Sequence, residues 1–144
     1  MANPLRRRHR IYLSLTVLLA ATPPVLAAGP ACPLPGQKDM LIARLYFGEA
    51  IPGREPLTGE EWRGFLSQTL TPRFPAGFTV YDAYGQWSDT KTRAIARENA
   101  KVIEIVAPDT QAFRKNIADI AAAYRKQFQQ ESVGIVTSEG CAEF

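Results

Sequence analysis

The feature of this sequence that most constrains its fold is the order in which its hydrophobic pattern changes period. Met40–Phe47 alternates between two faces, as a half-buried strand does. One face carries Leu41, Ala43, Leu45 and Phe47, and the other carries Ile42, Arg44 and Tyr46. A period of two that later gives way to a helical period indicates a mixed α and β chain.

A helix is predicted next, because Thr58 and Glu61 have the spacing of a capping box. The inward positions follow at i, i+3, i+4 and i+7, and they are Trp62, Phe65, Leu66 and Thr69. Pro72 is expected to end this helix after about three turns.

The stretch Thr71–Trp87 divides the chain into two similar halves. Pro75 and Gly77 predict a turn, and a second strand is expected from Gly77 to about Trp87. This strand would present Tyr81, Tyr84 and Trp87. The polar run Ser88–Ala100 is interpreted as a connection.

The second half repeats the pattern. Lys101–Ala107 reads as a third strand that Pro108 ends, and Asp109 is the expected N-cap of a long helix. Its apolar stripe is Phe113, Ile117, Ile120, Ala121, Tyr124 and Phe128, all expected in the core. Ser132–Ser138 is the predicted fourth strand.

The predicted order is therefore βαββαβ, which is the split βαβ arrangement of ferredoxin-like α+β folds. It has a four-stranded antiparallel sheet with both helices on one face. In this topology the fourth strand lies beside the first, so residues that precede strand one meet residues that follow strand four. Cys32 and Cys141 occupy those two places.

The N-terminal region is typical of a secretory signal peptide. Arg6, Arg7, Arg8 and Arg10 precede the apolar run Ile11–Ala21, and small residues follow up to Ala28. The expected organisation is a signal peptide at 1–27, a tether at 28–38 and one domain at 39–144, with no transmembrane helix in the mature chain. Export would place the protein in the periplasm or outside the cell. A lipid anchor at Cys32 is disfavoured, because Gly29-Pro30-Ala31 lacks the leucine and small residues of a lipoprotein signal.

The basic character of the chain belongs to its export signal. The formal charge is +3, but residues 1–27 hold four of the 17 basic residues and none of the 14 acidic ones. The remaining chain has 13 basic and 14 acidic residues, a formal charge of −1. Nucleic acid is therefore not an expected partner, since binding phosphates requires clustered positive charge.

Cys32 and Cys141 are the two cysteines, and an exported protein is expected to join them in a disulfide. A catalytic thiol is the alternative, but the single histidine, His9, lies in the signal peptide. The same absence of imidazole disfavours metal and haem sites and excludes a Ser-His-Asp triad. No metal or cofactor is expected.

The face of the sheet away from the helices is the predicted functional surface. Candidate ligand-binding residues are Arg44, Tyr46, Arg73, Tyr81, Trp87 and Glu104, with Glu104 and Tyr46 as weak catalytic candidates. Arg44 and Glu104 would lie on neighbouring strands within reach of an ion pair. Arg73, between two prolines, is pre-organised for an anionic partner. A solvated face, a homodimer interface and a ligand pocket remain open readings.

Several segments together resemble one family of small exported bacterial proteins, grouped as domain of unknown function 3574. The segments are Arg44–Gly48, Glu61–Trp62, Thr71–Pro75, Gly77–Val80, Gly85–Trp87, Arg97–Glu98, Tyr124–Phe128 and Gln130–Val133. The resemblance extends from about Asp39 to the C-terminus. The family pattern has a serine near Asn99-Ala100 that is absent here. The resemblance implies an exported domain, often membrane-anchored in relatives, and it supplies no activity.

The sequence thus favours a non-enzymatic module that binds an unidentified small molecule or envelope protein through the open sheet face. A homodimer formed through the same face is left open. The alternative is a cofactor-independent enzyme that resembles the dimeric α+β barrel monooxygenases or small isomerases and uses Arg44, Tyr46, Tyr81 and Glu104.

Overall fold

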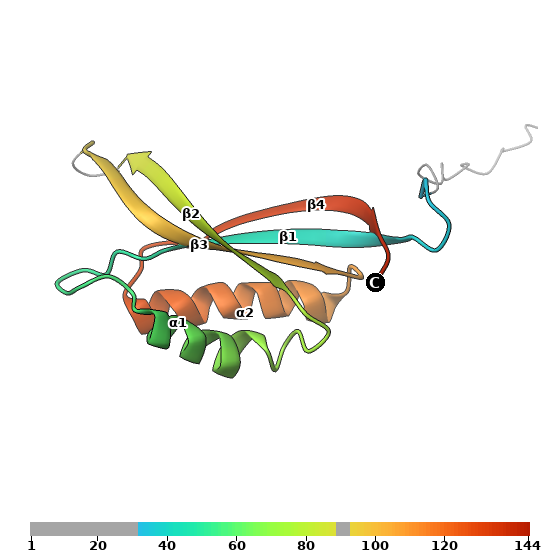
Figure 1. Ribbon diagram of the computed structural model, residues 1–144, viewed down its shortest axis with the longest axis horizontal. Helices are drawn as coiled ribbons and strands as arrows, with labels where there is room; N and C mark the ends of the chain where they lie inside the picture. The colour runs from blue at the N-terminus through green and yellow to red at the C-terminus, as the bar shows by residue number, and fades with distance from the viewer. Residues whose placement is uncertain (1–31, 89–92) are drawn as a thin grey trace, which may run out of the picture. The chain divides into compact units, whose positions relative to one another are not determined.

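Four antiparallel strands form one sheet, and two helices pack against one of its faces (Figure 1). The computed structural model describes residues 32–88 and 93–144. The elements are β1 (Lys38–Gly48), α1 (Gly59–Phe65), a π-helical turn η1 (Leu66–Leu70), β2 (Thr79–Ser88), β3 (Ile95–Ala107), α2 (Gln111–Phe128) and β4 (Gly134–Ala142). The predicted ferredoxin-like α+β fold is confirmed.

The strands lie in the order β2-β3-β1-β4, and each neighbouring pair is antiparallel. β1 is central, with Arg44 opposite Glu104 of β3 on one side and Val136 of β4 on the other. β2 and β3 form a hairpin that continues past the end of β1, because Gly48 pairs with Ala100 while β3 begins at Ile95. Within the described residues, the outer halves of β2 and β3 therefore form strand pairs only with each other.

The helix-covered face forms the core. Ala43, Leu45 and Phe47 of β1 are fully buried, as the alternation predicts. The predicted α2 stripe is buried along its whole length. Phe47 contacts three aromatic rings, with centroid distances of 5.6 Å to Trp62, 6.1 Å to Phe65 and 4.7 Å to Tyr124. This aromatic cluster joins the sheet to both helices.

The first helix begins as predicted but ends differently. The Thr58 hydroxyl accepts a hydrogen bond from the Glu61 amide at 3.2 Å, and the Glu61 carboxylate accepts one from the Thr58 amide at 2.9 Å. The last turn is π-helical, with the Thr71 amide bonded to the Leu66 carbonyl. A π turn contains an additional residue, so Leu70 is fully buried instead of the predicted Thr69, which is half-buried.

Two other predicted boundaries are wrong. β3 begins at Ile95, so the described part of the predicted connection Ser88–Ala100 is largely strand. Residues 95–100 alternate between exposed and half-buried, and none is fully buried, because the hairpin extends beyond the helix layer; they therefore lack the run of large buried side chains that marks a strand. The N-cap of α2 is Thr110, whose hydroxyl accepts from the Phe113 amide at 3.0 Å, whereas Asp109 pairs with Arg114.

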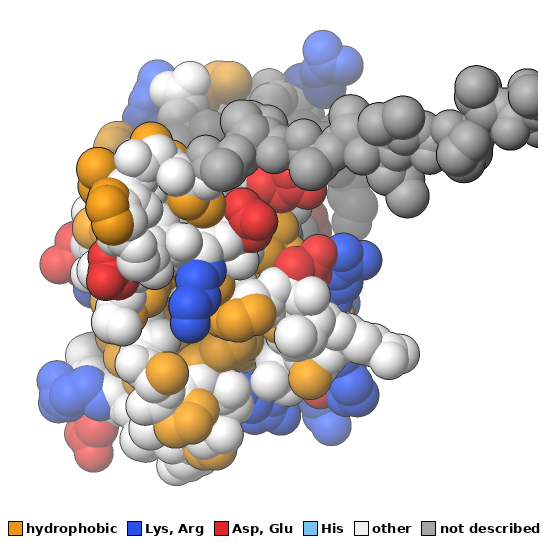
Figure 2. Space-filling view, turned by 90° about the vertical axis from the view of Figure 1, so that its right-hand side faces the viewer, with side chains coloured by type: hydrophobic (Ala, Val, Ile, Leu, Met, Phe, Trp, Pro, Cys, Tyr) orange, Lys and Arg blue, Asp and Glu red, His pale blue; other side chains and the backbone are white. Residues whose placement is uncertain are grey.

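Cys32 and Cys141 form the predicted disulfide, with 5.6 Å between their Cα atoms. β4 continues to Ala142, so Cys141 lies within the strand, opposite Asp39, and not after it. Figure 2 shows the end of the domain where β1 begins and β4 ends, and there acidic and basic side chains are interspersed with apolar ones.

The predicted signal peptide at 1–27 and the first part of the tether lie outside the described residues. Residues 33–36 of the tether form bends and a turn, and β1 already begins at Lys38, the last residue of the predicted tether. In the described part of the chain, no helix is both long and apolar enough to cross a membrane.

Candidate functional site

Arg44 and Glu104 meet on the open face as the predicted strand order requires. They are directly opposite in the β1–β3 register, and Arg44 Nε donates to Glu104 Oε2 at 2.6 Å. Their side chains are 43% and 22% exposed. The two groups therefore satisfy each other at the middle of the face, and a ligand would compete with this bond.

The other predicted site residues divide into two groups. Tyr46, Tyr81 and Trp87 lie on the open face, each with between two-fifths and half of its surface exposed. Arg73 does not join them. It follows η1 in the helix layer, and its guanidinium donates to the Thr69 carbonyl at 2.7 Å, where it caps the end of the helix.

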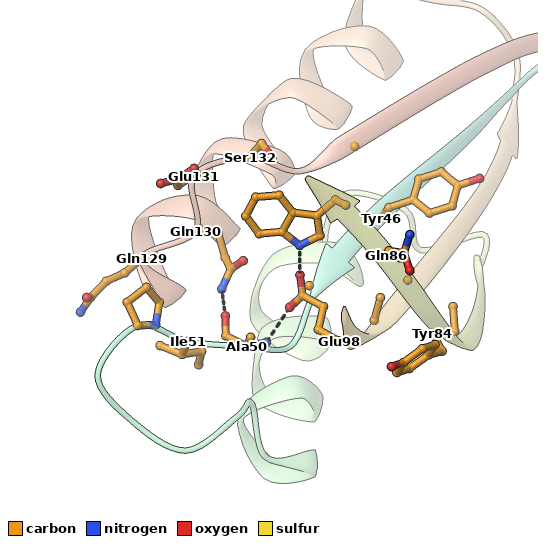
Figure 3. A pocket seen from close by; sticks show the side chains of 17 residues that line it. Tyr46, Ala50, Ile51, Tyr84, Gln86, Glu98, Gln129, Gln130, Glu131 and Ser132 are labelled. Carbon is orange, nitrogen blue, oxygen red and sulfur yellow. Dashed lines mark hydrogen bonds between the residues drawn. The ribbon is translucent and has the colours of Figure 1, made fainter. Parts of the chain in front are cut away.

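A cavity of about 670 Å³ opens beside Tyr46 and Trp87, toward the hairpin end of the open face (Figure 3). Its walls come from the end of β1 with the loop that follows it, from both strands of the β2–β3 hairpin, and from the loop between α2 and β4. The lining residues are Tyr46, Gly48, Ala50, Ile51, Pro52, Ala83, Tyr84, Gly85, Gln86, Trp87, Glu98, Ala100, Gln129, Gln130, Glu131, Ser132 and Gly134.

Glycine and alanine form the sheet floor of this cavity. The register aligns Ala83, Ala100 and Gly48 across three strands, places Gly85 beside Glu98, and places Gly134 beside Tyr46. A Cβ atom added at Gly85 would meet no atom within 4 Å, so it would enter the cavity. The absence of larger side chains at these positions creates the hollow, with Tyr46 and Trp87 standing at its sides.

Glu98 is the polar centre of the cavity. Its Oε1 accepts from the Trp87 indole N–H at 2.9 Å, and its Oε2 accepts from the Ala50 amide at 2.9 Å. The Ala50 carbonyl in turn accepts from the Gln130 side-chain amide at 2.5 Å (Figure 3). A Cβ atom at Gly48 would lie 2.8 Å from Glu98 Oε2, so glycine is required there for the carboxylate to keep its place.

Tyr124 links the cavity to the core. Its hydroxyl donates to the Gly48 carbonyl at 2.7 Å, although the ring belongs to the aromatic cluster below the sheet. Burial raises the pKa of the Tyr124 phenol well above its usual range, and the carboxylates of Glu49, Glu98 and Glu61 raise it further. Tyr124 therefore remains a neutral donor that fixes the end of β1 where the cavity begins.

Negative charge predominates around the cavity. Among its described lining residues, Glu98 and Glu131 are acidic and none is Lys, Arg or His. Lys101 lies on the helix-covered side of β3, where it bonds Asp82 and Glu49. The hydrogen bond with Asp82 is the main cause that raises the pKa of Lys101, so this cation remains charged and is engaged outside the cavity.

The structure places one potential metal-ligating group within the described residues: Cys32, Asp39 and Cys141. Its two sulfur atoms are bonded to each other in the disulfide. Neither is then a thiolate, so the donor set that a soft metal requires is not present at this end of the sheet.

Residues 42–144 match the model of a family described as Protein of unknown function (DUF3574). The chain belongs to this family. The resemblance of its segments to that family is thereby confirmed. A search of curated proteins found no match.

Among solved structures, this DUF3574 chain is similar to a phage SAM lyase in complex with S-methyl-5'-thioadenosine. The TM-score is 0.55, the identity is 15%, and the match covers 76% of this chain and 91% of the other. The apo state of a phage SAM lyase gives a TM-score of 0.54 at 18% identity, with 77% and 93% covered. At these identities the similarity establishes a shared fold.

Sequence reasoning missed most of the cavity, including Glu98. Its position in the hairpin was interpreted as a connection, so it was assigned to no sheet face. One signal could have located it: four segments that carry the family resemblance meet around this cavity. They are Arg44–Gly48, Gly85–Trp87, Arg97–Glu98 and Gln130–Val133.

Proposed function

We propose that this protein is a binding module that holds a small molecule in the cavity on the open face of its sheet. The observation that carries the proposal is the floor of glycine and alanine at the positions where three strands align. Glycine weakens a strand and supplies no side chain for packing, and it marks places where a ligand approaches the backbone closely. Most of a drug-sized ligand could be enclosed in a cavity of about 670 Å³.

The fixed carboxylate of Glu98 supports the same proposal. Its two hydrogen bonds, from Trp87 and Ala50, hold it in one position before any ligand arrives. A polar group held in advance in a binding cavity gives orientation and specificity at a low entropic cost. Under this proposal Tyr46 and Trp87 contact the ligand, and the Arg44–Glu104 pair lies beside the site.

The similar fold of the phage SAM lyase suggests a first probe, because that protein is described in complex with S-methyl-5'-thioadenosine. We expect this nucleoside to bind saturably in a calorimetric titration. Gly85→Val, which fills the cavity, should weaken the binding at least about tenfold, an effect of about 1.4 kcal/mol. Gly64→Ala is the control, since its added methyl group meets no atom within 4 Å and lies in α1.

Native mass spectrometry of the purified protein provides a test that needs no chosen probe. A molecule that co-purifies with the wild type but not with Gly85→Val would support the proposal. If nothing co-purifies and the nucleoside does not bind, or if Gly85→Val and the wild type bind equally well, the proposal is wrong. The same spectra report whether the predicted homodimer forms.

An enzyme is the second candidate, favoured by the lyase activity named for the protein of similar fold. In this chain Glu98 would then be the reactive carboxylate, because Glu104 is bonded to Arg44 and does not line the cavity. Incubation with S-adenosylmethionine and chromatography for S-methyl-5'-thioadenosine would detect such turnover, and Glu98→Gln should abolish it. If the nucleoside binds but no product forms, the enzyme hypothesis is wrong and the binding-module proposal stands.

The proposed module acts outside the cytoplasm, in the periplasm or the external medium. The Cys32–Cys141 disulfide is compatible with that location, because such bonds persist in oxidising compartments.

A further inference from the structure

The charges at the open-face positions of the sheet have an unequal distribution. By the strand register, the described open-face residues include two carboxylates, Glu98 and Glu104, and two cations, Arg44 and Lys38. Lys38 begins β1, whereas the cavity lies at the other end of that strand, beside Gly48. Arg44 is bonded to Glu104 at 2.6 Å, so this pair is internally balanced. Glu98 accepts hydrogen bonds only from neutral donors, Trp87 and Ala50, among the described residues. Among the described residues, the Glu98 carboxylate therefore has no side-chain counterion in the cavity lining.

Two features leave Glu98 able to receive a ligand. An ionised carboxylate offers about four lone-pair positions, and the two hydrogen bonds to Glu98 use two of them. Its location in the cavity lining also keeps it accessible from inside the hollow (Figure 3). Burial is the main cause of the raised pKa of Tyr124, and the Glu98 carboxylate is among three that raise it further.

Aromatic rings flank this carboxylate. Tyr46 and Trp87 line the cavity and are 42% and 43% exposed. The indole N–H of Trp87 points to Glu98, while aromatic faces attract cations within about 6 Å of the ring centre. Rings combined with the carboxylates of Glu98 and Glu131, and with no basic side chain among the described lining residues, make an environment that favours positive charge and opposes phosphate or carboxylate ligands.

We propose that the ligand of this cavity is an organic cation, in which an ammonium or sulfonium centre lies between Tyr46 and Trp87 and against Glu98. This inference rests on the proposed function and specifies its ligand class. The cation supplies the counterion that Glu98 lacks. The apolar substituents around the charge contact the two rings and the backbone of the Gly/Ala floor. A small quaternary centre suits this combination, because its charge is spread over methyl groups that can contact rings.

Choline and its uncharged carbon isostere, 3,3-dimethylbutan-1-ol, separate charge from shape. We expect choline to bind at least about tenfold more tightly in a ligand-observed NMR titration of the mature, oxidised protein. Glu98→Gln should reduce this preference to less than about threefold, because it removes the charge and keeps the shape. Glu60→Gln is the control, since Glu60 is an exposed carboxylate on α1 and should leave the preference unchanged.

Trp87→Leu provides a second variant if Glu98→Gln does not fold. It removes the ring and should weaken choline binding more than binding of the neutral isostere. Equal binding of choline and the isostere by the wild type would overturn the cation inference. The cation inference would also be wrong if choline did not bind while S-methyl-5'-thioadenosine did. If Gly85→Val then abolished binding of the nucleoside, the proposed site itself would stand. Insensitivity of every ligand to Gly85→Val would overturn both proposals.

Discussion

The two faces of the sheet are built from the same strands but differ in how their side chains are packed. On the helix-covered face, Leu45 and Phe47 are fully buried against aromatic rings. On the open face the residues alternating with them are Arg44 and Tyr46, and the neighbouring strands contribute glycine and alanine. The covered face is filled to stabilise the fold, whereas the open face is left hollow next to a fixed carboxylate. This contrast is what the proposed ligand-binding role of the open face would produce.

The largest expected effect on stability comes from truncating two adjacent residues of β1, one on each face, and comparing the two variants. Phe47→Ala should lower the free energy of unfolding by about 3–5 kcal/mol, because it removes a buried ring from the aromatic cluster and leaves a cavity. Tyr46→Ala, one residue earlier, should cost less than about 1 kcal/mol, because its ring is 42% exposed. Urea unfolding of both variants measures the pair. Similar losses would show that the open face also contributes to packing.

Removing the disulfide tests what stabilises β4, the edge strand of the sheet. β4 is exposed over most of its length, so it receives little support from the helix layer. Replacing Cys32 and Cys141 by serine should cost about 2–4 kcal/mol, and the loop closed by this bond has a sequence separation of 109. Amide exchange should accelerate in β4 before it does in the core of β1 and β3. Uniform acceleration across the sheet would mean that the bond stabilises the whole domain and not this edge.

The covered face could be predicted from the sequence far better than the open one. Burial enforces a regular pattern, so the alternation in β1 and the apolar stripe of α2 identified the core residues. Together with the strand order, the alternation also placed Arg44 and Glu104 on neighbouring strands of the same face. The pattern is weaker where no residue of a hairpin is fully buried. Residues 95–100 consequently lacked a strand signal, and the cavity that depends on them was missed. The π turn likewise has no simple periodic signature, so Leu70 was not predicted as the buried residue.

Tyr124→Phe should sharpen the comparison, because this hydroxyl connects the two faces. Removing it leaves the Gly48 carbonyl without its donor, and we expect a loss of about 1–3 kcal/mol in unfolding free energy. The variant retains the ring, so the aromatic cluster remains. A loss below about 0.3 kcal/mol would show that water replaces the hydroxyl and that the end of β1 is not fixed by the core.

The same variant should change the alkaline stability. The folded-state pKa of Tyr124 is raised above its unfolded value of about 10, so its contribution is fully present below pH 10. As the pH rises further, the phenol ionises in the unfolded chain first, and the contribution declines. Unfolding measured between pH 9 and 11 should show a shallower decline for Tyr124→Phe than for the wild type. Parallel declines would contradict the raised pKa.

The smallest effect on stability is expected where the effect on binding is largest. Gly85→Val should change the free energy of unfolding by less than about 1 kcal/mol, in either direction, because the new side chain enters empty space and valine favours extended strands. Gly134→Val should cost more, since a Cβ there already lies 3.3 Å from the Cβ of Tyr46. Chemical unfolding of the two variants measures this contrast between two glycines of the same face.

If the small residues serve packing, both valine variants should lose more than about 2 kcal/mol of unfolding free energy. If glycine at position 85 serves a ligand, only Gly134→Val should lose stability. A stable Gly85→Val protein that no longer binds would therefore show that glycine at position 85 serves the ligand and not the fold.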